Sequence, residues 1–332
     1  MATRRVTQST AVSVSAVAMV AAFALAVLVG SGAMNFSRAI HGTTPDYEIL
    51  IALRIPRALL ALWTGGALAL SGVLLQAMLR NPLATPYTLG VSGGAAVGAV
   101  AAILAGWEAI GGFSPVSLAA CAGAAAVLLL IVVISSERGK MSSTSLLLAG
   151  ITLNSICSAA ILFLSSLAGF LRSFSVNRWL MGGMDAPSYP TLLWLSVLLT
   201  PVCLVAFWHA REWNLLAVGE QWASTRGLSP SHLLLLGCAI TSILTGAVTA
   251  LTGPIGFVGL IIPHALRIWL GADHRVIAPC SFLIGGAFVA VCDVFSRTVL
   301  APVEIPVGVI TALLGGPVFI WMLRGRRKGF SA

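Results

Sequence analysis

Arginines at the ends of long apolar runs are the side chains of this sequence whose type and position suggest chemistry. Arg54 and Arg57 flank an Ile-Pro pair at the start of one run, and Arg297 closes another. The planar guanidinium of arginine pairs well with carboxylates, so these three residues are candidates for docking an acidic partner. The alternative is that their long side chains snorkel to the membrane surface and contact lipid phosphate. Composition leaves both interpretations open.

Catalytic motifs are missing from the sequence. It has no Gly-x-x-x-x-Gly-Lys-Ser/Thr phosphate loop, no Gly-x-Ser-x-Gly motif and no metal-ligand spacing such as His-Glu-x-x-His. We therefore assign no catalytic residue, no metal site and no cofactor. Acidic residues are sparse in the apolar runs, where Asp293 lies near one end and Glu304 precedes the last run. An ion-coupled carrier typically needs a mid-membrane carboxylate or unwound coordinating backbone, so these absences favour a permease whose energy comes from elsewhere.

The elements that must position these residues are membrane spans. The 332 residues are 58% hydrophobic and 9% charged, whereas a soluble domain carries roughly 25% charge. The composition predicts an all-α polytopic membrane protein, a single transmembrane permease domain over residues 1–332, and excludes a nucleic-acid partner for the net charge of +9. Charge-free windows long enough to cross a bilayer core of about 30 Å predict ten spans: 10–33, 57–79, 88–107, 115–134, 144–168, 190–208, 231–252, 255–271, 276–296 and 306–323.

Glycines modify two of these spans. Gly90, Gly94 and Gly98 recur at four-residue spacing and predict a bare helix face that a neighbouring helix can approach closely. The eighth span is interrupted by glycines and prolines over 253–263, so we expect it to be short or bent.

Basic residues predict the orientation. With an even number of spans both termini lie on one side, and thirteen of the 19 lysines and arginines then fall on the side of the RGRRK tail at 324–328. The positive-inside rule makes that side the cytoplasm. We expect a multi-pass protein of the plasma or inner membrane with both termini cytoplasmic. The six residues on the outer side are all arginines: Arg38, Arg54, Arg57, Arg172, Arg178 and Arg297.

The ten spans divide into two halves, approximately 1–185 and 186–332. Because each half has an odd number of spans, any internal duplication is inverted in the membrane, as is common in transporters. The longest inner loop, 209–230, has an apolar face and predicts a short amphipathic helix. Such a helix either lies on the lipid surface or fits a groove of a cytoplasmic partner, and the pattern does not separate the two.

Several stretches together resemble the FecCD-type permeases of ABC importers, which include iron-siderophore, haem and cobalamin permeases. They follow the family's order over almost the whole chain: LRIPR (53–57), SGVLLQAMLRNPLATPYTLGVSGGAAVG (71–98), LLLAG (146–150), RWLMGG (178–183), GPIGFVGLIIPHALR (253–267), GADHR (271–275) and EIPVGVITALLGGPVFIWML (304–323). The resemblance implies the type II ABC importer permease fold, with ten helices in two inverted five-helix halves. It also implies a second copy of the chain or a close homologue, two cytoplasmic ATP-binding subunits and one extracytoplasmic substrate-binding protein.

The resemblance also assigns roles to residues. Arg54, Arg57 and Arg297 match the family positions that meet glutamates of the binding protein. The loop residues Gly219, Glu220, Ala223 and Gly227 look like the family's coupling helix, which sits in a cleft of the ATPase; the pattern departs at Arg226, where leucine is common. Four residues align with the cytoplasmic gate of the cobalamin permease, although each type also favours helix ends: Asn81, Leu83, Ser143 and Thr144.

The function that the resemblance implies is import by alternating access. The docked binding protein releases its ligand into a cavity between the two permease subunits, and ATP-driven closure of the two ATPases moves the coupling helices and switches which gate is open. We expect the substrate to be an iron chelate, a siderophore complex or haem. RWLMGG is reminiscent of cobalamin permeases, which makes cobalamin the alternative. An ion-coupled secondary transporter and a membrane scaffold or receptor remain as functions from other classes.

Overall fold

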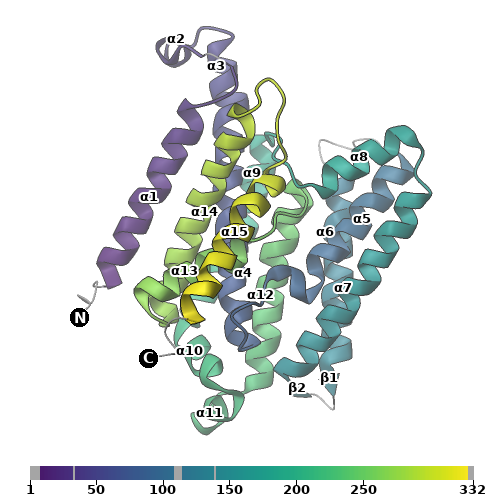
Figure 1. The fold of residues 1–332 in the computed structure, drawn as a ribbon, viewed down its shortest axis with the longest axis vertical. Helices are drawn as coiled ribbons and strands as arrows, with labels where there is room; N and C mark the ends of the chain where they lie inside the picture. The colour runs from purple at the N-terminus through teal and green to yellow at the C-terminus, as the bar shows by residue number, and fades with distance from the viewer. Residues whose placement is uncertain (1–7, 33, 108–113, 138–139, 328–332) are drawn as a thin grey trace.

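The computed structural model describes residues 8–32, 34–107, 114–137 and 140–327 as a bundle of helices (Figure 1). Within this part of the chain, ten helices are apolar: α1 (Gln8–Leu28), α4 (Ile55–Met78), α5 (Val91–Ala105), α6 (Pro115–Ser135), α7 (Ser143–Ser166), α9 (Tyr189–Trp208), α12 (Pro230–Thr252), α13 (Val258–Leu270), α14 (His274–Thr298) and α15 (Val307–Arg327). Seven are long and apolar enough to cross a membrane, and α5, α13 and the apolar part of α15 (Val307–Ile320) are shorter.

Each of the ten predicted spans coincides with one of these apolar helices, and seven of the ten are long enough to cross a membrane. Five lie before residue 185 and five after it, so each of the two predicted halves contains an odd number of these helices. The first helix ends five residues earlier than predicted, and α13 is short, as the glycines and prolines before it indicated. Part of the orientation prediction rests on Arg4, Arg5, Arg138 and Lys328, which lie outside the described residues.

Burial separates central from peripheral helices. Most residues of α4, α12 and α14 are buried, whereas less than a third are buried in α1, α6, α7 and α9. In Figure 1, α4, α12 and α14 occupy the middle of the bundle, α1 lies at one edge, and α5 to α7 form the other. The core is therefore made by helices from both halves of the chain.

Small residues bring the central helices into backbone contact. A Cβ atom added at Gly65 of α4 would lie 2.0 Å from the carbonyl oxygen of Gly285 of α14, and one at Gly72 would lie 1.9 Å from that of Gly259 of α13. Lipid gives no hydrophobic drive for helices to associate, so such close approach supplies the dispersion contacts that hold the bundle.

The predicted bare face of the third span is also confirmed. In α5, Gly94 packs against Gly123 of α6, and a Cβ at Gly98 would lie 2.0 Å from the Ala119 carbonyl oxygen. Gly90 has a different role, because it adopts φ +76° in the turn before α5.

Several short elements join the spans, and the sequence analysis did not predict most of them: α2 (Phe36–Ile40), α3 (Asp46–Glu48), one π-helical turn at Ile49–Arg54, one 3-10 turn at Pro86–Leu89, α8 (Phe170–Leu180), α10 (Ala210–Val218), α11 (Glu220–Thr225) and the antiparallel strands β1 (Ser136–Glu137) and β2 (Lys140–Met141). The expected single amphipathic helix of the 209–230 loop is in fact two helices, because the backbone changes direction at Gly219. The π-helical turn continues into α4, so this span runs from Asp46 to Met78.

Gly72→Ala tests the backbone packing. The new methyl group has no room against the Gly259 carbonyl, and overpacking of this kind costs about 1–3 kcal/mol or more. We expect a reduced yield of monodisperse protein in detergent and a lower unfolding temperature. Gly316→Ala is the control, because Gly316 is also helical but has no atom within 4 Å of the added Cβ. Equal stability of the two variants would contradict this account of the packing.

Candidate functional site

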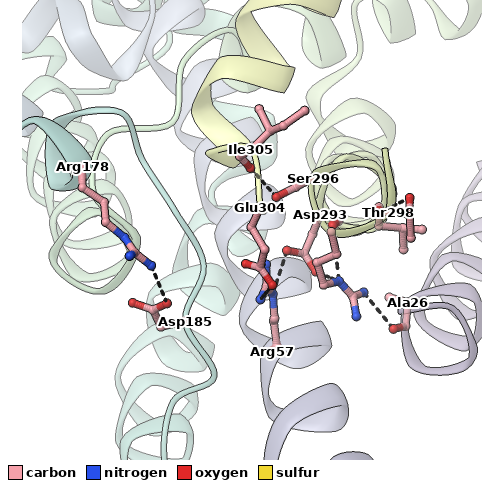
Figure 2. A network of polar contacts seen from close by, with 11 residues as sticks. Ala26, Arg57, Arg178, Asp185, Asp293, Ser296, Thr298, Glu304 and Ile305 are labelled. Atoms are coloured by element: carbon pink, nitrogen blue, oxygen red, sulfur yellow. Dashed lines mark hydrogen bonds and ion pairs between the residues drawn. The ribbon is translucent and has the colours of Figure 1, made fainter. Parts of the chain in front are cut away.

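Two of the predicted docking arginines, Arg57 and Arg297, belong to an ion-pair cluster around Asp293 of α14, at the end of the bundle predicted to face outward (Figure 2). Arg57, in the first turn of α4, donates from Nε to Asp293 Oδ1 at 2.9 Å. Arg297, one helical turn after Asp293, places its Nε 3.1 Å from Oδ2. Asp293 has no exposed side-chain surface. Two guanidinium groups therefore neutralise one buried carboxylate.

Glu304, in the loop before α15, completes the cluster. Its two carboxylate oxygens accept hydrogen bonds from Nη1 and Nη2 of Arg57, both at 3.0 Å. The Glu304 side chain is 42% exposed, against 12% for Arg57. The Arg57 guanidinium is thus held on one edge by a buried carboxylate and on the other by an exposed one.

Arg54 and Arg297 bind the carboxyl-terminal end of α1. Arg54 Nη1 donates to the carbonyl oxygens of Val27 and Leu28 at 3.1 and 2.8 Å. Arg297 Nη2 donates to the Ala26 carbonyl oxygen at 2.9 Å. The last carbonyls of a helix have no partner within it and carry partial negative charge, so two cations stabilise this end.

The structure thus brings the three predicted docking residues together and gives each an internal partner. Arg54 and Arg297 are 6% and 5% exposed. Neither is arranged as a snorkelling side chain, because their guanidinium groups bond to the protein. Of the three, only Arg57 lines the large cavity at this end of the bundle.

The outer cavity has a volume of about 1210 Å³ and lies among the outer ends of several helices. Arg57, Glu304, Arg178 and Asp185 all line it. Figure 2 shows the Arg178–Asp185 pair apart from the cluster around Asp293. Trp179 also lines it. The cavity therefore combines apolar surface with charges of both signs.

At the opposite end of the bundle, the predicted coupling residues lie in α11 and at the two glycines that flank it (Figure 1). Gly219 separates α10 from α11, Ala223 of α11 is fully buried, and Gly227 ends α11 with φ +80°. The amides of Gly227 and Leu228 donate to the carbonyls of Ser224 and Ala223. This is a Schellman motif, which requires a left-handed residue at the Gly227 position. Arg226, where the sequence departs from the family pattern, is the exposed residue just before it.

α10 is tied to the start of α14. Asn214 donates to Asp273 Oδ1 at 2.9 Å, and the His274 amide donates to Asn214 Oδ1 at 2.8 Å. Asp273 caps α14 by accepting from the Arg275 amide. Hydrogen bonds from the Arg275 side chain lower the pKa of Asp273 well below its usual range. The ionised carboxylate is therefore the stable form of this cap.

The predicted gate residues lie near the same end but differ in environment. Asn81 Oδ1 accepts from the Leu83 amide at 2.9 Å, which is a local turn, and Leu83 is exposed. Ser143 begins α7 and is 4% exposed, whereas Thr144 beside it is exposed. The Ser143 hydroxyl donates to the carbonyl oxygen of Met78, the last residue of α4.

Sequence reasoning named Asp293 and Glu304 only as isolated acids and missed their role as arginine partners. One signal was present, because Asp293 and Arg297 are four residues apart and so share a helix face. The pairing with Arg57 joins residues 236 positions apart and had no local signal. Among the described residues, no group of three or more His, Cys, Asp or Glu side chains is arranged to hold a metal ion.

Asp293→Ala tests the cluster. It leaves Arg57 and Arg297 close together without the carboxylate between them, and breaking a buried ion pair costs about 3–5 kcal/mol. We expect a clearly lower unfolding temperature in detergent. Asp185→Ala is the control, because the Asp185 side chain is 94% exposed and lies 3.9 Å from Arg178. A variant of Asp293 that is as stable as this control would show that the cluster does not hold the helices.

Comparison with known proteins identifies the family. The FecCD transport family matches residues 18–325. The hemin transport system permease protein HmuU of Yersinia pestis is 37% identical over 305 residues, which cover 90% of each chain. The vitamin B12 import system permease protein BtuC of Escherichia coli O9:H4 is 39% identical over 286 residues, which cover 86% of each chain.

Two solved structures have the same fold as this chain. One described as an inward-facing, metal-chelate type ABC transporter is 28% identical, with a TM-score of 0.84 over 96% of this chain and 99% of that one. PsaBC of Streptococcus pneumoniae, at 15% identity and a TM-score of 0.52 over 86% of this chain and 94% of that one, shares the fold. The ten-helix bundle with these matches shows that the chain belongs to the FecCD transport family and is a permease subunit of an ABC importer.

Proposed function

We propose that this permease imports an iron chelate, a ferric siderophore or haem, and that separate ATP-binding subunits drive the transport. The observation that carries the proposal is the structural match over 96% of the chain to a transporter described as metal-chelate type. Identity to relatives does not separate the substrates, because the hemin and vitamin B12 permeases are 37% and 39% identical to this chain. Cobalamin, itself a bulky metal-bearing compound, is the alternative.

The outer cavity supports a bulky substrate. Sites for drug-sized ligands have volumes of roughly 300–1,000 Å³, and this cavity, of about 1210 Å³, is larger. Its mixed lining suits weak contact with a chelate that must enter and leave, whereas tight selection is left to the binding protein.

The proposed assembly contains two permease subunits, this chain with a second copy or a close homologue, in the plasma or inner membrane. Two ATP-binding subunits contact α10 and α11 on the cytoplasmic side, and a substrate-binding protein docks outside. The start of α1 and the end of α15 lie at the same end of the bundle as α10 and α11 (Figure 1). This position supports cytoplasmic termini. The coupling role of Gly219, Glu220, Ala223 and Gly227 is supported by their position on a short, capped helix at that end.

Docking is proposed at Arg54, Arg57 and Arg297, with Arg57 as the residue that an acidic partner reaches first. Its guanidinium is already bonded to Glu304, so a carboxylate of the binding protein has to replace this exposed partner. Asp293 keeps the guanidinium in place during the exchange. Arg54 and Arg297 then contribute positive potential from beneath the surface.

Transport follows as alternating access. The docked binding protein releases the chelate into the outer cavity, and ATP binding and hydrolysis move the coupling helices. The cytoplasmic gate, for which we propose Asn81, Leu83, Ser143 and Thr144, opens as the outer side closes.

The experiment that tests the proposal is uptake into proteoliposomes containing the permease, its ATP-binding subunits and the binding protein. We expect ATP-dependent uptake of a ferric siderophore or haem. Uptake of cobalamin alone would select the alternative substrate. Transport driven by a proton or sodium gradient without the ATP-binding subunits would support a secondary transporter instead.

The docking proposal predicts opposite effects for two neighbouring substitutions. Glu304→Gln removes the competing charge and is expected to tighten binding of the binding protein about fivefold, whereas Arg57→Ala is expected to weaken it at least about tenfold. Surface plasmon resonance on nanodisc-embedded permease measures both. Arg178→Ala is the control, because this arginine also lines the outer cavity but lies outside the cluster. Unchanged affinity in the Arg57 variant would refute docking at this residue.

A further inference from the structure

Glu220 of the coupling segment is bonded to the end of another helix. Its Oε1 accepts hydrogen bonds from the amide and from the hydroxyl of Ser143, at 3.1 and 2.5 Å. Arg80, two residues after the end of α4, places its Nη2 3.6 Å from the same oxygen. The Glu220 side chain is 26% exposed. A residue expected only at a partner interface therefore has three contacts within the chain.

The contact with Glu220 gives a hydrogen-bond acceptor to a backbone amide at the start of α7. Ser143 is the first helical residue, and the amides of the first turn have no acceptor within the helix. The Ser142 side chain accepts from the Ser145 amide, and the Glu220 carboxylate accepts from the Ser143 amide. Negative charge at a helix N-terminus is also favourable because of the helix dipole. Glu220 thus completes the cap of α7 from a different segment.

Ser143 extends the contact to α4. Its hydroxyl also lies 2.6 Å from the carbonyl oxygen of Met78. Because a hydroxyl has one proton, it donates to Glu220 or to Met78 at a given moment, while the Ser143 amide can bond to Glu220 in both cases. The end of α4, the start of α7 and the coupling segment therefore meet at the Ser143 side chain.

We propose that Glu220 is the positioning residue that transmits movement of the coupling helix to the cytoplasmic ends of α4 and α7. The proposal rests on the proposed function, in which α11 contacts an ATP-binding subunit. Two of the proposed gate residues lie directly at these ends, since Ser143 is the contact itself and Asn81 follows Arg80. When α11 moves as a unit, the bond to Ser143 carries the start of α7 with it, or breaks and releases it.

The alternative is that Glu220 serves only to bind the ATP-binding subunit. The two roles differ in what Ser143 does. In a purely interfacial role Ser143 is irrelevant to coupling, whereas in transmission Ser143→Ala and Glu220→Ala have the same effect and the double variant adds little to either.

The first test needs no partner protein. Hydrogen exchange of the full-length chain in nanodiscs reports on the first turn of α7, and Glu220→Ala is expected to speed exchange there about five- to tenfold through loss of the cap. Glu220→Gln keeps an acceptor oxygen and is expected to restore much of the protection. Ser224→Ala is the control, because the Ser224 hydroxyl donates within α11, to the Glu220 carbonyl, and not to α7. Unchanged exchange in Glu220→Ala would overturn the proposal.

The second test measures coupling in the complete transporter in proteoliposomes. Ser143→Ala, which lies outside α11, is expected to keep the ATP-binding subunits bound but to lower substrate imported per ATP hydrolysed by about fivefold or more. Adding Glu220→Ala is expected to lower this ratio little further. Normal coupling in Ser143→Ala, with loss of subunit binding in Glu220→Ala, would overturn the proposal. If the wild-type chain fails to bind ATP-binding subunits at all, the proposed function is wrong, and this outcome is separate from the exchange result.

Discussion

The outer half of the bundle depends on the ion pairs that the buried carboxylate of Asp293 forms with Arg57 and Arg297. A charge without solvent contact is expensive in a membrane protein unless it is paired, and here two arginines pair with it. Because Arg57 belongs to α4 and Arg297 also bonds to the end of α1, this one carboxylate connects three helices. Glu304 adds the loop that leads into α15. Removing the central charge leaves Arg57 with Glu304 as its carboxylate partner and Arg297 with backbone carbonyl acceptors, so the link between α4 and α14 is lost.

The same two helices that carry this cluster also reach the opposite face. α4 has Arg57 at its outer end and Met78 at its inner end, and α14 runs from its Asp273 cap to Arg297. They are held together by backbone contact at Gly65 and Gly285, where no side chain fits between them. A closely packed helix pair of this kind transmits displacement along its length, because a packed interface has little room to deform. The same packed helix pair therefore contributes residues to the candidate sites at both ends of the bundle.

At the end of the bundle predicted to face the cytoplasm, the short helices α10 and α11 each contact a different long helix. α10 bonds through Asn214 to the cap of α14, and α11 bonds through Glu220 to the start of α7. Buried Trp213, which donates to the Ala206 carbonyl, also fixes α10 to α9. The segment is thus bonded to α7, α9 and α14. This arrangement is suited to a permease whose energy comes from outside its own sequence.

The sequence by itself determined the ten apolar helices and most of their ends, because apolar length and charge placement are local properties. It also determined the close packing at Gly94 and Gly98, since helical spacing puts both on one face. Only the tertiary structure decided what the charged residues do. Arg57 meets Asp293 and Glu304, and Glu220 meets Ser143, across separations that no local pattern encodes. The helix α8 was missed for a related reason: its sequence has little net hydropathy, so a search for charge-free windows passes over it.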